Sequence, residues 1–480
     1  MEGGKYEDVL SSKRNVPGND SYLRYLSSAT TDPNVGGAVS DYALYSYLSR
    51  VNYSLNSKYL LTASIRADGS SKFAKGEKWG YFPSVSGGWR ISNEKFYNAL
   101  NLQKVIDDLK IRLGWGQVGN QNISDNAFRT LIAGGNTRRY IFDGTIVQGY
   151  APINLGNKNL TWETTESTNL GIDFFLFKNK LSGSFDFYNK QTKDMLLKLP
   201  IPLSAGLPDS PWTNAGDVEN KGFEFMANYH NKWKEVNFSI NMNISSYRNR
   251  ILSLGGGEPI MGGEQRLGYT TKTMIGHPIG EFFGYVVEGV FQNQKEVDDA
   301  NALSSEDLYY QDVMTRPGDF KFKDLNGDGR ITGEDRTFIG SPHPDFTYGI
   351  NLAAEYRQFD ISLFLQGSQG GDIFNVFKYF THQNTGYFNA PAGMIEEAWH
   401  GEGTSNSQFQ ISASTANNNL RPSSWYIEDG SFLRIKNIQI GYRLNKWVCK
   451  KIGIAECRIY VGGQNLYTFT HYSGLDPELA

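Results

Sequence analysis

Long hydrophobic runs and an excess of charge of either sign are both missing from this 480-residue sequence. No stretch approaches the ~18 consecutive apolar residues of a transmembrane helix, which excludes a helical membrane protein. Lys and Arg number 47, against 50 Asp and Glu, and the net charge is −3. Without a basic stripe, the sequence gives no electrostatic basis for binding nucleic acid.

Cysteines and export signals are equally sparse. Cys449 and Cys457 are the only cysteines, and they form no metal or redox motif. A local disulfide and two free thiols both remain open. The N-terminal MEGGKYEDVLSSKRN is polar and lacks the apolar core of a signal peptide. Because the sequence also stops soon after a predicted strand, at HYSGLDPELA, we expect it to be part of a longer protein.

Catalytic motifs are absent as well. The six histidines are scattered, and no HExxH, paired-cysteine or GxSxG pattern accompanies them. Acidic pairs such as Glu396 and Glu397 arise easily by chance among 50 acidic residues, so they do not indicate a glycosidase. The sequence therefore predicts a protein without enzymatic activity.

Glycine and aromatic residues are abundant, with 52 Gly, 28 Tyr and 29 Phe, which suits strands and turns. Segments of alternating polar and apolar residues recur along the chain, each as long as a barrel strand. Their apolar positions are Ile111, Leu113 and Trp115; Leu170, Ile172, Phe174 and Leu176; Phe185 and Phe187; Phe223, Phe225, Ala227 and Tyr229; Phe238, Ile240, Met242 and Ile244; Tyr348, Ile350, Leu352 and Ala354; Ile361, Leu363 and Leu365; Ile438, Ile440 and Tyr442; and Ile459 and Val461. They predict an all-β fold with roughly a dozen strands.

The predicted connections alternate between short and long. Tight polar links lie at 178–180, 231–235 and 357–359, and long Gly- and Asn-rich stretches follow Leu197, Leu254, Asp372 and Phe469. Outer-membrane barrels have short turns on the periplasmic side and long loops outside. This asymmetry favours an antiparallel transmembrane β-barrel over the alternative, a soluble β-sandwich or propeller.

The alternation also assigns the two faces of each strand. The lipid-facing side must be apolar, because hydrocarbon offers no hydrogen-bond partners. Polar residues expected on the lumen side are Lys110, Arg112, Asp173, Asp186, Asn241 and Asn243. Aromatic residues expected in the interfacial girdle are Tyr229, Trp233, Tyr356 and Trp447.

The stretch DLNGDGRITGED at 324–335 has the spacing of a calcium-binding loop. Oxygen ligands are expected from Asp324, Asn326 and Asp328 at the first, third and fifth positions, from the Arg330 carbonyl at the seventh, and from Asp335 at the twelfth. Asp in place of Glu at the twelfth position departs from the usual pattern. An ion-free Asp/Asn/Gly-rich turn is the alternative. Since the flanks look extended, we predict a structural calcium ion in an extracellular insertion at 317–340.

Aromatic residues in the predicted outer loops are candidates for binding a substrate. They are Trp212, Tyr269, Tyr379, Phe380, Tyr387, Phe388 and Trp425, and packing between loops is the alternative for each. Individual substrate-binding residues stay unassigned. Helical content is expected to be low and confined to 296–303, 305–313 and 392–399.

Several longer motifs resemble the SusC/RagA-like outer-membrane proteins. In chain order they are KYLLTASIRADGSSKFAKGEKWGYFPSVSGGWRIS (58–92), DLKIRLGWGQVGNQNI (108–123), LTWETTESTNLGIDFFLFKNKLSGSFDFYNKQTKDMLL (160–197), NAGDVENKGFEF (214–225), PGDFKFKDLNGDGRITGEDRTFIGSPHPDFTYGINL (317–352), DGSFLRIKNIQIGYRL (429–444) and IYVGGQNLYTFTHYSGLDPE (459–478). The resemblance covers nearly the whole chain, in the family's order.

The resemblance implies a 22-stranded barrel filled by a plug, of which residues 1–480 would be the C-terminal barrel portion. It also implies a TonB box, energy from the inner-membrane proton gradient, and a SusD-like surface lipoprotein over the mouth. No signal peptide, TonB box or plug is recognised in this sequence, and the earliest strands and the final one are not found. Because an open set of strands leaves backbone groups unpaired, we expect this chain alone neither to insert stably nor to transport.

The function that follows is import of a nutrient, an oligosaccharide or a peptide, across the bacterial outer membrane without covalent chemistry. The surrounding lipid, a SusD-like lipoprotein and TonB are the expected partners, and the suspected calcium ion is the only expected cofactor. A passive or adhesive outer-membrane barrel is one alternative. A secreted, calcium-stabilised β-enzyme acting on polysaccharide is another.

Overall fold

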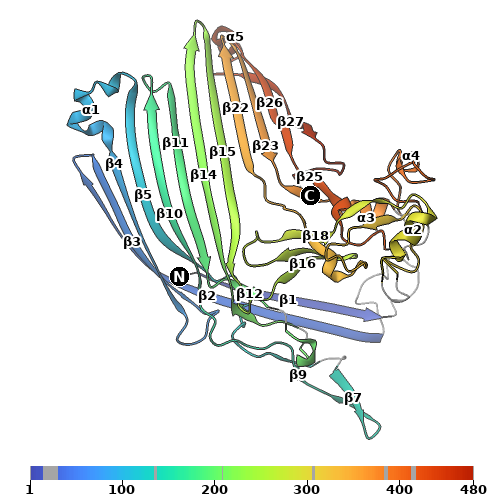
Figure 1. Cartoon of the computed structure of the whole chain (residues 1–480). Helices are drawn as coiled ribbons and strands as arrows, with labels where there is room; N and C mark the ends of the chain where they lie inside the picture. The colour runs from blue at the N-terminus through green and yellow to red at the C-terminus, as the bar shows by residue number, and fades with distance from the viewer. Residues whose placement is uncertain are drawn as a thin grey trace.

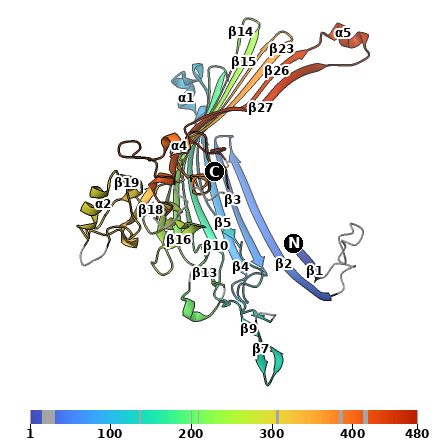
Figure 2. The same cartoon turned by 90° about the vertical axis from the view of Figure 1, so that its right-hand side faces the viewer.

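A single antiparallel sheet of 13 strands dominates the computed structural model, which describes residues 2–14, 31–134, 138–199, 201–207, 209–304, 309–382, 388–411 and 418–478. In sheet order the strands are β1 (Glu2–Arg14), β2 (Thr31–Leu55), β3 (Tyr59–Ser70), β4 (Trp79–Arg90), β5 (Ile106–Asn120), β10 (Glu163–Leu176), β11 (Leu181–Lys193), β14 (Asp217–Trp233), β15 (Val236–Ser253), β22 (Phe346–Tyr356), β23 (Phe359–Gln369), β26 (Phe432–Arg443) and β27 (Arg458–Thr470). Each pairs with its neighbours along the chain, and β1 and β27 form the two edges. Figures 1 and 2 show one curved layer, like a section of a barrel wall. The all-β, partial-barrel prediction is confirmed.

The connections alternate as predicted. Tight turns join β10 to β11, β14 to β15 and β22 to β23, and they lie at the upper end of the sheet in Figure 1. These turns hold non-glycine residues in the left-handed region, with φ values of 54° at Lys234 and 55° at Arg357. Two short helices, α1 (Lys95–Ala99) and α5 (Lys446–Lys451), occupy the same end. The opposite end carries the long loops, so it corresponds to the outer mouth.

Small elements fill the long loops. They are β6 (Ile132–Ala133), β7 (Arg139–Phe142), β8 (Thr145–Gln148), β9 (Ala151–Pro152), β12 (Leu196–Lys198), β13 (Trp212–Asn214), β16 (Ile260–Gln265), β17 (Gly268–Thr273), β18 (Glu281–Tyr285), β19 (Val287–Val290), α2 (Gln294–Asn301), β20 (Phe320–Phe322), β21 (Arg336–Gly340), β24 (Asp372–Phe374), α3 (Phe377–Thr381), α4 (Met394–Glu397) and β25 (Ile427–Asp429). The stretch 317–340, in which an insertion was expected, lies inside the larger loop that joins β15 to β22. The described residues outside the sheet belong to its connections and its C-terminal extension, and none forms a separate plug domain.

The apolar side of the sheet is not covered by a second layer. Cross-strand register places Leu170 opposite Phe187 and Met242 opposite Ile350, so apolar side chains form continuous rows across the strands. These rows stay open, with Val51 65% and Val461 71% exposed. A sandwich or propeller would bury this surface against another sheet, so the soluble alternative is excluded. The face is of the kind that contacts lipid.

Aromatic side chains mark both ends of the apolar band. At the short-turn end, the predicted girdle residues Trp233, Tyr356 and Trp447 are exposed, whereas Tyr229 is half-buried against a neighbouring ring. On β4, Trp79 and Trp89 lie near the two ends of the strand. At ~3.3 Å per residue they are about 33 Å apart along the strand. A barrel tilt of ~40° reduces this to about 25 Å, the height of the apolar band of outer-membrane barrels.

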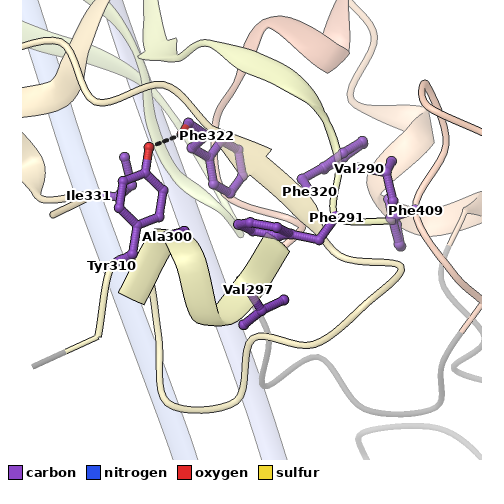
Figure 3. Packing of buried hydrophobic residues seen from close by; sticks show 9 residues of the cluster. All are labelled: Val290, Phe291, Val297, Ala300, Tyr310, Phe320, Phe322, Ile331 and Phe409. Carbon is purple, nitrogen blue, oxygen red and sulfur yellow. Dashed lines mark hydrogen bonds between the residues drawn. The ribbon is translucent and has the colours of Figure 1, made fainter. Parts of the chain in front are cut away.

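Two long loops fold together into one cap over the outer mouth. The cap comprises residues 254–345, between β15 and β22, and 370–431, between β23 and β26. Its core is drawn in Figure 3: Phe320 contacts Phe409 of the second loop, with ring centroids 5.1 Å apart. Each fully buried side chain of this kind contributes about 1.5–3 kcal/mol. The two loops therefore stabilise each other.

Helices are few and short, as expected, although their bounds differ from the prediction. The helix expected at 296–303 is found as α2, which begins earlier because the Asn293 side chain caps it by accepting the Glu296 amide. Of the stretch 305–313, residues 305–308 lie outside the described residues and 309–313 are not helical, so this prediction is not confirmed. The helix expected at 392–399 is reduced to α4. Among the described residues, no helix combines the length and apolar character needed to cross a membrane.

Candidate functional site

The polar face of the sheet carries the charged residues that the sequence assigned to it. Lys110 and Arg112 of β5 contact Asp173 of β10 at 2.9 and 2.8 Å, and Arg112 also reaches Asp186 of β11 at 3.0 Å. Gly171 lies between Arg112 and Asp186 in the register, and a Cβ there would lie 2.7 Å from the guanidinium carbon. The guanidinium therefore crosses a strand because that position has no side chain.

Asn241 and Asn243, which the sequence predicted on the polar face, are found on that face. Asn241 lies in one cross-strand row with Asn228 and Asn351, and Asn243 lies opposite Gly349. The lumen-side assignment is thus confirmed for the charged and the amide residues alike. A wall of this kind presents hydrogen-bonding groups to the barrel interior and keeps hydrocarbon on the other side.

A cleft of about 1080 Å³ opens between the 370–431 loop of the cap and the residues that follow β27. Its residues are Asn375, Phe377, Lys378, Thr381, His382, Pro391, Ala392, Glu397, Thr404, Ser405, Asn406, Ser407, Gln408, Trp425, Glu428, Asp429, His471, Ser473, Gly474 and Leu475. They come from α3 and α4 with their flanking residues, from the segments 404–408 and 425–429, and from the residues that follow β27. Most carry a hydroxyl, amide or charged group, so the cleft suits a polar ligand.

A partly buried ion pair forms one wall of the cleft. Lys378 Nζ lies 2.7 Å from the Glu428 carboxylate, and their side chains are 16% and 13% exposed. Burial would raise the pKa of Glu428, but hydrogen bonds from Lys378, the Ser473 amide and Asn375 outweigh it and hold that pKa below its usual range. Burial, followed by the nearby Lys378 charge, lowers the pKa of His382, so its imidazole is neutral at pH 7.

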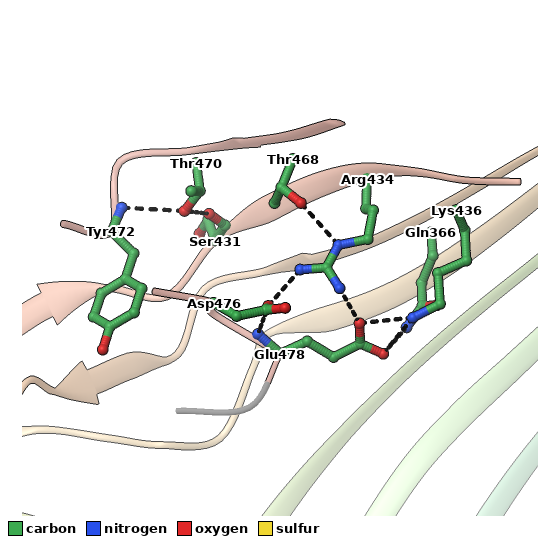
Figure 4. Close-up of polar contacts among 9 residues, drawn as sticks. All are labelled: Gln366, Ser431, Arg434, Lys436, Thr468, Thr470, Tyr472, Asp476 and Glu478. Atoms are coloured by element: carbon green, nitrogen blue, oxygen red, sulfur yellow. Dashed lines mark hydrogen bonds and ion pairs between the residues drawn. The ribbon is translucent and has the colours of Figure 1, made fainter. Parts of the chain in front are cut away.

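The segment after β27, residues 471–478, forms a strap that contacts this ion pair through Ser473. Arg434 of β26, whose side chain is 4% exposed, binds the carboxylates of Asp476 and Glu478 (Figure 4). Lys436 reaches Glu478 at 2.7 Å. These partners hold the pKa values of both acids below their usual range. The ion pairs therefore fix the strap so that its earlier residues line the cleft.

The predicted calcium loop folds around its own backbone amides. Asp324 accepts hydrogen bonds from the Gly327 amide at 2.7 Å and the Gly329 amide at 2.8 Å. The fully buried Asp335 accepts from the Leu325 and Thr332 amides at 2.9 and 2.7 Å. At the sixth position the loop requires glycine, because Gly329 has a φ of 79° and a Cβ there would lie 2.2 Å from the Leu303 carbonyl oxygen.

The remaining predicted ligands, Asn326, Asp328 and Arg330, lie in the same turn. The Asn326 amide nitrogen donates to Asp328 at 3.1 Å, and the Arg330 amide donates to the Asp328 carboxylate at 2.9 Å. These oxygens are the hard donors that calcium prefers. Within the described ranges, however, no three His, Cys, Asp or Glu side chains converge closely enough to hold a metal ion. The calcium site stays a prediction.

The predicted outer-loop aromatic residues are only partly brought together. Trp425 lines the cleft, and Lys378 lies over its ring at 5.1 Å. Tyr379, Phe380 and Phe388 pack on one another with ring centroids 5.2 Å apart, which is contact within a loop. Three others are placed elsewhere: Trp212 lies in a separate loop, where its indole donates to Ser124, Tyr269 is on β17, and Tyr387 lies outside the described residues.

Several residues of the cleft were not singled out from the sequence. Lys378, Glu428 and Asn375 lie far apart in the chain and follow no periodic pattern. For Arg434 and Lys436 a signal was present, because they alternate along one face of a predicted strand and the acidic LDPE follows the next one. The cysteines are free thiols, with Cys449 buried in α5, which settles the alternative that spacing left open.

Comparisons with known proteins agree with this architecture. A family model described as "TonB dependent receptor-like, beta-barrel" matches residues 3–466. TonB-dependent receptor P3 of Formosa agariphila is 34% identical over 98% of this chain and 46% of its own length. TonB-dependent receptor SusC of Bacteroides thetaiotaomicron is 30% identical over 96% of this chain and 44% of its own length. The chain thus spans about half the length of the curated relatives it matches.

Solved structures show the same fold. A structure described as the RagAB peptide transporter matches with a TM-score of 0.81 and 24% identity, over 99% of this chain and 50% of that one. A second, the RagAB peptide importer in the "open-open" state, matches with a TM-score of 0.77. The chain therefore belongs to the family of TonB-dependent receptor-like β-barrels, which are outer-membrane receptors and transporters and not enzymes.

Proposed function

We propose that this chain forms part of the wall and the outer mouth of an importer that takes up an oligosaccharide or a peptide with energy supplied through TonB. The observation that carries the proposal is the single-layer sheet with an open apolar face, a polar opposite face and a cap at one end. Such a wall separates lipid from a polar interior, while loops at the mouth capture the ligand. The matched relatives are named as TonB-dependent receptors, and the matched structures as a peptide transporter and importer.

Different parts of the described structure would anchor the wall, line the interior and capture the ligand. The apolar rows anchor the wall in the membrane, and the polar rows around Arg112 line the interior. The cap and the strap form the cleft in which a ligand is first held. No bond of the ligand is broken in this scheme, and the coupling to TonB supplies the directionality.

An uptake experiment tests the proposal. The gene is deleted in its host and restored in trans, and internalisation of a fluorescent panel of oligosaccharides and peptides is measured with and without functional TonB. We expect uptake of at least one class to need both the gene and TonB. Uptake that survives loss of TonB would favour the passive-barrel alternative, and no gene-dependent uptake of any ligand would refute import.

A SusD-like surface lipoprotein is proposed as the partner that covers the cap. The relatives SusC and RagAB support it, the latter through the two-component name of its complex. Purification of the intact protein in mild detergent, followed by mass spectrometry, should recover one lipid-anchored protein in stoichiometric amount. Recovery of the barrel protein alone under several mild detergents would count against this partner.

The secreted-enzyme alternative finds no support in this architecture. Its apolar face would stand in water across the whole sheet, an arrangement that soluble proteins avoid. The family to which the chain belongs consists of membrane receptors. We therefore retain import as the proposed function.

A further inference from the structure

The charged side chains on the lipid-facing side of four neighbouring strands, β10, β11, β14 and β15, gather near the outer ends of these strands. We call this set the outer charged patch. Arg248 and Arg250 belong to it because they continue the alternation of Met242 and Ile244 along the apolar face of β15. The members of the patch are Glu166, Lys193, Asp217, Glu219, Lys221, Arg248 and Arg250.

The acidic members of the patch already have partners, whereas the two arginines do not. Lys193 Nζ lies 3.0 Å from the Glu166 carboxylate, and Lys221 Nζ lies 2.9 Å from that of Glu219. Asp217, at the start of β14, accepts hydrogen bonds from a backbone amide and a serine hydroxyl. Both arginines are exposed, and among the described residues neither has an acidic side chain within ion-pairing distance. The patch therefore holds two cations that are free to bind an anion.

The strand register brings like charges together in this patch. Lys221 of β14 lies directly opposite Arg248 of β15. The Cβ atoms of such a pair are ~4.5–5.5 Å apart, and like charges in this position destabilise a sheet. Arg250 lies on the same face as Arg248, about 7 Å along the strand. An anion that contacts both arginines would offset this repulsion.

The patch lies at the depth of lipid headgroups. Phe223, which is 36% exposed, belongs to the apolar face and lies opposite Ser246. From there β15 continues toward the loop end of the sheet, as Figure 1 shows, and Arg248 and Arg250 follow two and four residues further out. At ~3.3 Å per residue and a tilt of ~40°, they are about 5 and 10 Å beyond this aromatic row. The headgroup region outside the hydrocarbon is roughly 5–8 Å deep on each side of a bilayer.

We propose that the outer charged patch binds the phosphate-bearing headgroup of a lipid in the outer leaflet. The planar guanidinium groups of Arg248 and Arg250 match phosphate oxygens in a bidentate geometry. Met242 and Ile244 continue the same face toward the middle of the apolar band and contact the acyl chains. A lipid thus uses both the charged and the apolar parts of this surface, whereas a soluble anion uses only the first. The proposal does not depend on which nutrient is imported.

Binding of a defined lipid to the intact protein in mild detergent tests the proposal. The probes are lipid A with its phosphates, the same lipid after enzymatic removal of the phosphates, and inorganic phosphate, and the readout is native mass spectrometry. We expect the phosphorylated lipid to bind and its affinity to fall as salt is added, because an exposed ionic contact is screened. The lipid without phosphates should bind at least about tenfold more weakly.

Substitutions identify the site. The double variant Arg248→Gln with Arg250→Gln removes both charges and should weaken binding of the phosphorylated lipid about tenfold or more. Arg50→Gln makes the same chemical change at an exposed arginine on the polar face of β2, opposite Ser64, and should bind as the unsubstituted protein does. Heat-modifiable gel mobility shows whether each variant is folded. If the double variant does not fold, the two single variants replace it, each with an expected loss of about fivefold.

Several results would overturn the proposal. They are unchanged binding in the folded arginine variants, an equal loss in Arg50→Gln, and equal binding of the lipid with and without its phosphates. Displacement of the lipid by inorganic phosphate at the same concentration would show an anion site without preference for a lipid, and it would also refute the proposal.

Discussion

The lipid-facing assignment can be tested at two adjacent positions of β15. Met242 lies on the apolar face, opposite Ile350 on the neighbouring strand, and is 36% exposed. Asn243 follows it, is exposed and points to the polar face. Phe346 is the aromatic residue at the outer end of the strand that contains Ile350, and the two lie four positions apart. At ~3.3 Å per residue and a tilt of ~40°, Ile350 is about 10 Å below the outer aromatic belt. Met242 is therefore close to the middle of the apolar band.

Arginine at these two positions should have different effects. An Arg on the lipid face near the bilayer midplane costs about 2–4 kcal/mol, because its charge has no polar partner in hydrocarbon. Met242→Arg should thus lower the folding equilibrium constant about 30-fold to 1000-fold. Asn243→Arg places the same charge on the wet face and should cost less than about 1 kcal/mol.

The assay is equilibrium unfolding of the intact protein from lipid vesicles by guanidinium, read by heat-modifiable gel mobility and Trp fluorescence. We expect the unfolding midpoint to fall for Met242→Arg and to stay nearly unchanged for Asn243→Arg. Equal loss in both variants, or tolerance of both, would refute the assignment of the faces. A larger loss in Asn243→Arg would place lipid on the opposite side of the sheet.

Four further outcomes are expected. Phe320→Ala should destabilise the cap by about 3–5 kcal/mol, seen as faster amide hydrogen exchange in 254–345 and 370–431 with the sheet unaffected, because a fully buried ring is lost; equal exchange in the two proteins would contradict the shared core. Arg434→Gln should release the strap to proteolysis at neutral pH, since it leaves two carboxylates without their buried cation. In the unsubstituted protein the strap should be released only on acidification. Folding lowers the pKa values of Asp476 and Glu478, so these acids stabilise the fold at any pH above their pKa values in the unfolded chain. That stabilisation is lost as the pH falls through their lower pKa values in the folded protein. Millimolar calcium should raise the melting temperature of the cap, and Asp328→Asn should abolish that rise; no calcium effect in the unsubstituted protein would leave an ion-free turn.

Much of the candidate site could not be predicted from the sequence, and the cleft shows why. Its residues come from the cap loops and the strap, and within those segments no regular spacing relates one lining residue to another. The contact of Lys378 with Glu428 depends on how two distant segments of one loop fold back on each other. The roles of individual loop aromatic residues could not be predicted either. Phe380 packs against Phe388 and Trp425 lines the cleft, although all three come from loops of similar composition.

The wall of the barrel, in contrast, was determined by the sequence alone. Side chains alternate strictly across a strand, so Ile240 and Met242 share one face and Asn241 and Asn243 the other once the segment is extended. Only the tertiary structure decided that the two long loops share a core and that the strap is held by Arg434. The physical reason is range: a period of two residues acts along one strand, whereas these contacts join residues that only the folded chain brings together.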